Sequence, residues 1–147
     1  MHGDFGPNAI SLAPRLVSQY GRLGATRIYQ APAVGSVANG ATSQAVPITW
    51  RTDGIVIAMY GQTLDGAVAS LAGMALRVQL GGSEDLFTDG NTGVAVPMLS
   101  LFGQSQNWFP LMRQCYKTQV WSVSFTNTSG GALTPSVQFA VIEKPGT

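Results

Sequence analysis

Residues 119–143 read QVWSVSFTNTSGGALTPSVQFAVIE, and this stretch decides the fold. In both of its halves large apolar side chains alternate with smaller or polar ones: Trp121, Val123, Phe125, Val137, Phe139 and Val141. Side chains on a strand point to opposite faces with period two, so each half predicts a strand with one apolar face. The turn-rich residues 127–131 between the halves favour an antiparallel hairpin. Because an isolated hairpin is marginally stable in water, its apolar faces require a further sheet from the upstream chain.

The upstream chain contains several segments that predict strands. Residues 54–60 include a continuous apolar run, which is typical of a strand buried on both faces, and residues 74–80 alternate cleanly. Proline limits two further candidates to sheet edges or bulges, because it cannot donate a ladder hydrogen bond. These candidates are residues 25–31, which end before Pro32, and residues 44–50, which contain Pro47.

The remaining segments are less regular. Residues 94–102 predict a strand that is bent or at an edge near Pro97, and residues 107–112 predict a proline-limited extended segment. Within residues 61–73 the apolar spacing favours a helix of one or two turns, although two glycines weaken it. Pro14 could begin another short helix over residues 15–20.

About eight strands without regular strand-helix alternation predict an all-β fold in which two antiparallel sheets pack as a sandwich. An eight-stranded jelly roll suits the number and length of the strands best. An immunoglobulin-like sandwich is the alternative, although the paired cysteines of its antibody form are missing, since Cys115 is the only cysteine. We expect this sandwich domain at residues 25–147, preceded by an extended N-terminal arm at residues 1–24.

The N-terminal arm combines glycine and proline with scattered aliphatic residues. A disordered tail would carry more charge and fewer aliphatic side chains, so an arm that lies on a neighbouring subunit is favoured over a poorly ordered terminus. Four apolar residues of the arm are the expected partner-binding anchors: Phe5, Ile10, Leu12 and Leu16.

Charged residues make up only 10% of the chain, against about 25% in an average soluble domain. This indicates a surface of uncharged polar groups or one that partners cover. The formal net charge is +1 and the 8 basic residues are scattered singly, so the basic face that nucleic-acid binding requires is missing. The sequence predicts no membrane-spanning helix and no secretion signal.

The sequence contains few residues that could act in catalysis or bind a metal. His2 is the only histidine, and one histidine with one cysteine cannot complete a structural zinc site, so we expect no cofactor. Two hypotheses stay open, a carboxylate pair for glycoside hydrolysis and a Ca²⁺ site in the acidic residues 83–93. Ordinary turn chemistry also explains the carboxylates concerned, which are Asp53, Asp65, Glu84, Asp85 and Asp89.

Exposed aromatic residues would instead favour carbohydrate binding. The candidates for stacking on sugar rings are Trp50, Trp108, Phe109 and Tyr116. Large aromatic side chains are usually buried, and Trp121 belongs to the core because it shares a face with Val123 and Phe125. The sequence Asn127-Thr128-Ser129 matches an N-glycosylation acceptor but is more simply a turn.

Three segments resemble the small jelly-roll decoration, or cement, proteins of tailed-bacteriophage capsids. These segments are Trp108-Phe109-Pro110-Leu111, residues 121–128 and residues 134–141. The resemblance implies a non-enzymatic virion protein that binds the major capsid protein on the outside of an icosahedral shell and stabilises contacts between capsomers. It also implies a homodimer or homotrimer, assembly in the host cytoplasm, and no partner in nucleic acid or membrane. The alternative function is a receptor- or glycan-binding module of a phage tail or fibre.

Overall fold

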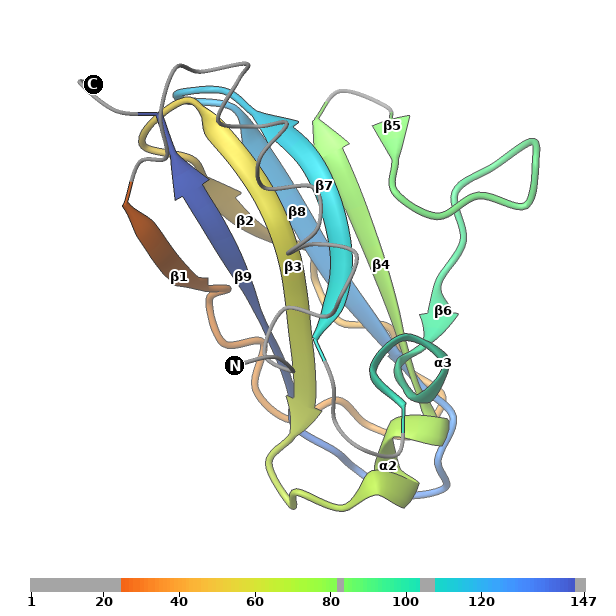
Figure 1. Ribbon diagram of the computed structural model, residues 1–147. Coiled ribbons are helices and arrows are strands. Elements are labelled where there is room, and N and C mark those ends of the chain that lie inside the picture. Colours follow the sequence, from red (N-terminus) through yellow and green to blue (C-terminus); the bar gives the residue numbers. More distant parts are fainter. Residues whose placement is uncertain (1–24, 82–83, 104–107, 145–147) are drawn as a thin grey trace.

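The computed structural model is a sandwich of two antiparallel β-sheets, and it describes residues 25–81, 84–103 and 108–144 (Figure 1). These residues contain nine strands and two short helices, so the predicted all-β, two-sheet sandwich is confirmed. The predicted helix at residues 15–20 and the rest of the N-terminal arm lie outside the described residues.

The first sheet has four strands in the order β1-β9-β3-β7. Their bounds are Thr26–Gln30 for β1, Pro135–Glu143 for β9, Gly54–Thr63 for β3 and Phe109–Cys115 for β7. The residues of β3 from Gly54 to Met59 are all buried, which confirms the prediction of a strand that is buried on both faces. The edge position predicted for residues 25–31 is also confirmed, because β1 ends the sheet.

The second sheet has the order β2-β8-β4-β5, and β6 also pairs with β4. Their bounds are Val46–Thr49 for β2, Val120–Asn127 for β8, Met74–Gly81 for β4, Glu84–Asp85 for β5 and Val96–Pro97 for β6. Every second residue of β4 is buried, as its alternating sequence predicts. Pro47 lies in the edge strand β2, where a missing N–H is tolerated.

The strand order is that of a jelly roll. The chain passes from one sheet to the other at every connection between successive strands except those joining β4, β5 and β6. As a result β1 lies beside β9, and β2 lies beside β8. Eight strands form the two ordered rows, and the two-residue β6 is the additional one.

The predicted hairpin of residues 119–143 is wrong. β8 pairs with β2 and β4, whereas β9 pairs with β1 and β3, so the two strands lie in opposite sheets. Their apolar faces meet across the core, where the ring centroids of Trp121 and Phe139 are 6.0 Å apart. Alternation specifies which face of a strand is buried but carries no information about its neighbours in the sheet. Here both apolar faces are buried by packing against each other rather than against a third layer.

The predicted strand at residues 94–102 is wrong over most of its length. Only β6 is extended, and Met98–Phe102 forms the short helix α3. Met98 and Phe102 are four positions apart, so they lie on one helix face, and both are buried. Gly61 of β3 makes room for them, since a Cβ there would lie 2.6 Å from side-chain atoms of both residues. The other described helix, α2 at Val68–Ala72, confirms the short helix expected within residues 61–73.

Interlocking aromatic rings fill the core between the sheets. Trp50 meets Tyr29, Trp121 and Phe139 edge to face, with ring centroids 5.0, 5.1 and 5.9 Å apart. The prediction that Trp121 belongs to the core is confirmed, and Trp50 is equally buried. Edge-to-face pairs add about 0.5–1.5 kcal/mol each beyond the area they bury, so this cluster fixes how the two sheets face each other.

Asn127, at the end of β8, anchors the connection to β9 from inside. It is fully buried, and its side-chain amide donates to the carbonyl oxygens of Val37 and Gly131. Its Oδ1 accepts the backbone N–H of Ser129. The acceptor-like sequence at residues 127–129 is therefore a structural turn, and a glycan on this amide would break the hydrogen bonds that hold it.

We expect the thiol of Cys115 to be unreactive while the protein is folded. Its side chain is buried, and burial, together with the nearby carboxylates of Asp53 and Glu143, raises the pKa of the thiol to about 12. The nucleophilic form of cysteine is the thiolate. We expect no reaction with Ellman's reagent at about pH 8 without denaturant, and full reaction of one thiol after unfolding in guanidinium chloride. Rapid labelling of the native protein would contradict the burial of this side chain.

Candidate functional site

A buried glutamate joins three segments at one end of the four-stranded sheet. Glu143, the last residue of β9, accepts hydrogen bonds from Arg27 Nε and the Tyr29 hydroxyl of β1, both at 2.6 Å. Arg51, between β2 and β3, donates from Nε at 3.2 Å. The side chains of Arg27 and Arg51 are about half exposed, whereas the side chain of Glu143 is only 7% exposed.

We call Glu143, Arg27, Tyr29 and Arg51 the glutamate cluster, and their protonation states follow from the hydrogen bonds among them. Burial alone would raise the pKa of Glu143, but the hydrogen bonds from Tyr29, Arg51 and Arg27 outweigh it and lower the pKa to about 2. Burial and the hydrogen bond to Glu143 raise the pKa of Tyr29 to about 12. A carboxylate with so low a pKa is a poor general acid or base near neutral pH, so the cluster suits a structural role.

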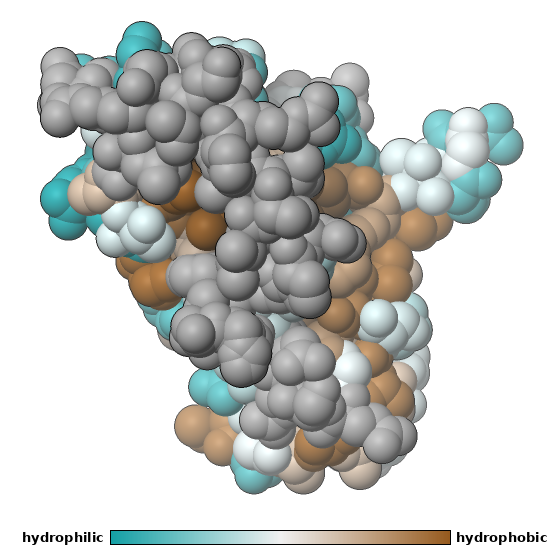
Figure 2. Space-filling model, viewed as in Figure 1, coloured by the Kyte–Doolittle hydropathy of each residue, from teal (hydrophilic) through white to brown (hydrophobic). Residues whose placement is uncertain are grey.

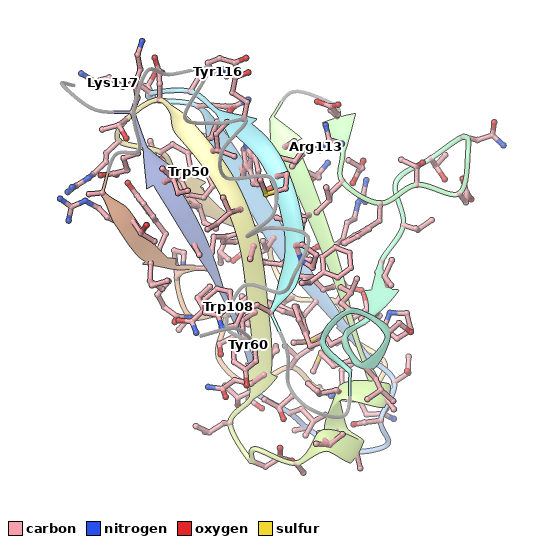
Figure 3. The ribbon with its side chains drawn as sticks, in the orientation of Figure 1. Trp50, Tyr60, Trp108, Arg113, Tyr116 and Lys117 are labelled. Atoms are coloured by element: carbon pink, nitrogen blue, oxygen red, sulfur yellow. The ribbon has the colours of Figure 1, made fainter. Side chains whose placement is uncertain are left out.

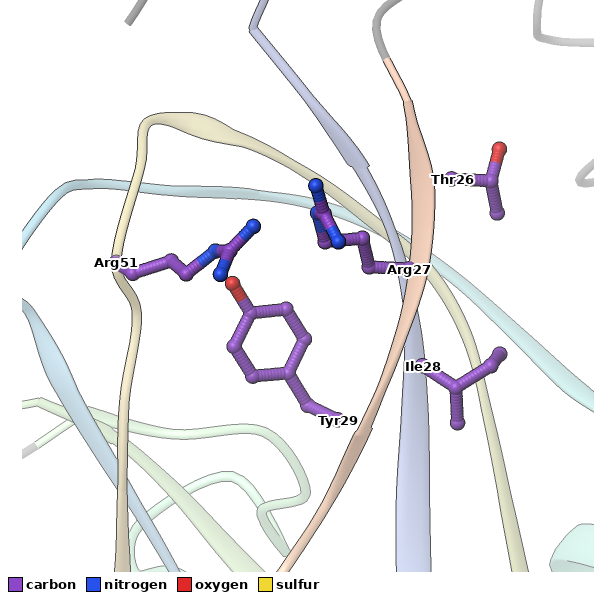
Figure 4. Close-up of a pocket in the computed structure, with 5 residues that line it drawn as sticks. All are labelled: Thr26, Arg27, Ile28, Tyr29 and Arg51. Atoms are coloured by element: carbon purple, nitrogen blue, oxygen red, sulfur yellow. The ribbon is translucent and has the colours of Figure 1, made fainter.

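The outer side of the glutamate cluster forms an open hollow of about 340 Å³, lined by Thr26, Arg27, Ile28, Tyr29 and Arg51. Figure 4 shows the guanidinium groups of Arg27 and Arg51 near the end of the Tyr29 ring that carries the hydroxyl. Two guanidinium groups face one carboxylate, so one positive charge is in excess here. Such a hollow attracts an anionic group of a partner more than a cationic one.

The carboxylates considered for hydrolysis or Ca²⁺ binding have structural partners. Asp65 accepts hydrogen bonds from the hydroxyls of Thr63 and Ser70 at 2.6 Å each, which fixes the turn before α2. Arg77 Nε lies 2.8 Å from Asp85. The other three also have partners: Asp53 accepts from the N–H of Lys117, Asp89 from the N–H groups of Asn91 and Thr92, and Glu84 lies 3.8 Å from Arg113.

Two pairs of these carboxylates point apart rather than converging. Asp53 and Asp65 flank opposite ends of β3, whose ten residues span about 33 Å at the usual strand rise. Glu84 and Asp85 are neighbours on β5, so their side chains point to opposite faces. Among the residues that the structure describes, no group of three or more His, Cys, Asp or Glu side chains could hold a metal ion.

The four aromatic candidates for sugar stacking do not share one surface. Trp50 lies between the two sheets, whereas Trp108 lies beside Tyr60 next to β3, with ring centroids 5.6 Å apart (Figure 3). Phe109 packs on the core and meets Phe87, at a centroid distance of 6.1 Å. Tyr116, near the turn between β7 and β8, is half exposed.

The outer face of the four-stranded sheet carries a second apolar cluster, separate from the core between the sheets. We call it the outer apolar cluster: Ile55, Ile57, Ala58, Trp108, Met112, Ala140 and Ile142. Directly paired residues of antiparallel strands share a face. Ile55 pairs with Ile142 and Ala58 with Ala140, so these rows of side chains point away from the core.

Partly buried apolar side chains also line the side of the molecule on which β6 and α3 lie. We call this surface the edge flank: Leu86, Phe87, Leu99, Leu101, Phe109 and Leu111. Figure 2 shows apolar residues, in brown, gathered on this side. The edge strands β7 and β5 end their sheets here, so the flank is one of the two open sides of the sandwich, β1 and β2 forming the other.

The predicted partner-binding anchors Phe5, Ile10, Leu12 and Leu16 lie outside the described residues. Sequence reasoning missed the glutamate cluster because Arg27 and Glu143 are 116 positions apart. One signal was present in the alternation of the last strand. Val137, Phe139 and Val141 point inward, so Glu143 is a charged residue at an inward position and requires buried partners.

Comparison of the chain with protein-family models, curated proteins and solved structures found no match. In the described ranges, no helix has the length and apolar character needed to cross a bilayer.

Proposed function

We propose that this chain is a non-enzymatic structural protein of a bacteriophage virion, one that binds the outside of an icosahedral capsid and stabilises contacts between capsomers. Its partners are the major capsid protein and further copies of itself, in a homodimer or homotrimer. It reaches the capsid surface during assembly in the host cytoplasm. The observation that carries this proposal is the jelly-roll strand order. Within it, the three segments of the resemblance fall largely in β7, β8 and β9.

Charge and site chemistry support a structural role over a catalytic one. Jelly rolls serve viral capsids, lectins and cupins, so the fold alone does not choose among functions. Only 10% of the residues are charged, and the carboxylates described above hold turns and strands together. Glu143, whose side chain is 7% exposed, has a pKa far below neutrality. A rigid block with these properties suits repeated weak contacts on a symmetric shell, where many copies add avidity.

Two surfaces are assigned to the two kinds of partner. The N-terminal arm binds the shell through Phe5, Ile10, Leu12 and Leu16. The edge flank serves self-association, because it joins apolar side chains to the ends of both sheets. Apolar surface left in water at a sheet edge is a common site of protein association.

Removing residues 1–24 should leave the sandwich folded and weaken shell binding by about 100-fold or more, since each buried aliphatic anchor contributes about 1.5–3 kcal/mol. The measurement is co-sedimentation with purified tailed-phage shells that lack their own decoration protein. The matched control is Leu64→Ser in the full chain. Leu64 is an apolar residue outside the arm that is 83% exposed, and its replacement should leave binding unchanged.

Two outcomes contradict different parts of this proposal. If the truncated chain pellets with shells as the full chain does, the arm is not the contact. If the full chain pellets with no member of a panel of shells, the capsid function itself is rejected.

A further inference from the structure

The fold gathers four basic residues, which are scattered in the sequence, at the end of the four-stranded sheet where β3 begins. These residues are Arg27, Arg51, Lys117 and Lys144. The two arginines meet at Glu143. The backbone N–H groups of the two lysines donate to the side chain and to the carbonyl oxygen of Asp53, the residue just before β3.

Positive charge exceeds negative charge at this end of the sheet. The other two described basic residues, Arg77 and Arg113, each lie near a carboxylate of β5, so each of those pairs is balanced. By contrast, Arg27 and Arg51 share the single carboxylate of Glu143. An anionic group of a partner is therefore attracted to this end rather than to the β5 pairs.

The two shared arginines keep donors for a further acceptor. Arg27 and Arg51 each use Nε for Glu143, and Arg51 also interacts with the side chain of Tyr29. A guanidinium group carries five N–H donors, so among the described residues most donors of both groups remain free. The two side chains are 49% and 56% exposed, and they line the open hollow of about 340 Å³ (Figure 4).

The hollow follows the free edge of β1. In the described chain β1 ends its sheet and pairs with β9 alone. The backbone groups of Ala25 and Ala31 form hydrogen bonds with β9. Because hydrogen-bonding directions alternate along a strand, the backbone groups of Thr26 and Ile28 point to the open edge, and both residues line the hollow.

We propose that this edge binds an extended acidic segment of a partner protein, which adds a strand to β1 and places an Asp or Glu side chain between Arg27 and Arg51. In an antiparallel addition, Thr26 and Ile28 exchange backbone hydrogen bonds with the partner. Arg27 then occupies a non-hydrogen-bonded pair, the kind in which opposite side chains lie closest. The argument does not use the proposed function.

The charge of the hollow selects a carboxylate over a phosphate. The single positive charge in excess at Arg27 and Arg51 matches the single negative charge of a carboxylate. A phosphate monoester carries about −1.5 to −2 near neutral pH. A nucleic acid presents a row of phosphates and is bound by a basic stripe, whereas this hollow contains two arginines that already hold one carboxylate.

NMR spectroscopy of the isotope-labelled full chain tests the proposal with an acidic peptide, acetyl-SVTETVS-amide. Its matched control is acetyl-SVTQTVS-amide, which keeps the extended shape and removes the charge. At millimolar concentrations the glutamate peptide should shift the backbone amide signals of Thr26 and Ile28 and the Nε–H signals of Arg27 and Arg51. The glutamine peptide should bind about 10-fold more weakly or less, because it lacks the hydrogen bonds between charged groups.

Two variants separate charge from strand pairing. Arg51→Gln leaves Arg27 to balance Glu143, and it should weaken binding of the glutamate peptide by about 10-fold. Its matched control, Arg113→Gln on β7, should leave that binding unchanged. Ile28→Pro removes an N–H that points away from β9, so it should spare the ladder within the sheet and abolish binding of both peptides. Unchanged amide signals away from the hollow show that each variant is folded.

The outcomes distinguish the possible occupants of the β1 edge. Absence of shifts at the hollow with millimolar peptide, or equal affinity for the two peptides, overturns the proposal. Tighter binding of a single-stranded oligothymidylate, lost in Arg51→Gln, assigns the hollow to nucleic acid instead. The same shifts on raising the protein concentration without peptide assign it to a second copy, and either result makes the partner-segment assignment wrong. No shell is used, so failure here leaves the capsid proposal standing, and the reverse also holds.

Discussion

Trp121→Ala should lower the free energy of unfolding by about 3–5 kcal/mol, a large share of the roughly 5–15 kcal/mol that holds a typical domain together. Trp121 is buried on the inner face of β8, with its ring 5.1 Å from Trp50 and 6.0 Å from Phe139. Its indole N–H donates to Gln119 Oε1 at 3.3 Å. Truncation therefore leaves a cavity at the point where the two sheets meet and removes both ring contacts.

The neighbouring residue supplies a matched control for this substitution. Val120 is on the same strand but is 44% exposed, so Val120→Ala should change stability by less than about 0.5 kcal/mol. Urea denaturation of both variants, with the slope compared to that of the parent, gives the two values directly. Similar losses for the two alanine variants would show that Trp121 does not occupy the core.

Glu143 should make the protein acid-sensitive over a defined range. Its pKa is about 2 in the folded protein, against 4.5 in a model compound, so between these values the unfolded chain binds more protons. Stability therefore rises with pH across this window, is fully present above about pH 4.5, and is lost as the pH falls towards 2. A difference of this size corresponds to about 3 kcal/mol.

Glu143→Gln removes the charge while keeping the side-chain size. We expect the variant to be less stable than the parent at neutral pH by about 3 kcal/mol, because Arg27 and Arg51 lose their shared carboxylate. We also expect it to lose much of the slope of stability against pH between about 2 and 4.5. Glu84→Gln is the control, since Glu84 lies on the surface. The assignment fails if Glu143→Gln keeps the acid slope of the parent.

Local sequence was sufficient to predict most strands and their buried faces. Period-two alternation depends only on neighbouring residues, which is why β4, β8 and β9 and the inward position of Trp121 were found. The neighbours of a strand in its sheet depend on the topology of the whole chain, so the pairing of residues 119–143 could not be predicted from local sequence. The helix α3 was missed because Leu99 and Leu101 also fit a strand, while the decisive spacing joins Met98 and Phe102.

The candidate site was less predictable than the fold. Asp53, Asp65 and Asp89 sit where turn chemistry placed them, and their hydrogen bonds are local or link adjacent turns. The glutamate cluster instead requires β1 and β9 to be neighbours, a fact that exists only once the topology is known. The outer apolar cluster has the same origin, because a continuous apolar run such as residues 55–59 does not show which of its side chains point away from the core.

The pairing of the earliest described strands with the latest ones has a consequence for biosynthesis. β1 pairs with β9 and β2 with β8, so neither can enter its sheet before residues 120–143 have been synthesised. Until then the nascent chain presents unpaired, apolar strands. The two sheets therefore cannot be completed before β9 is available, and the unpaired strands are open to aggregation until then.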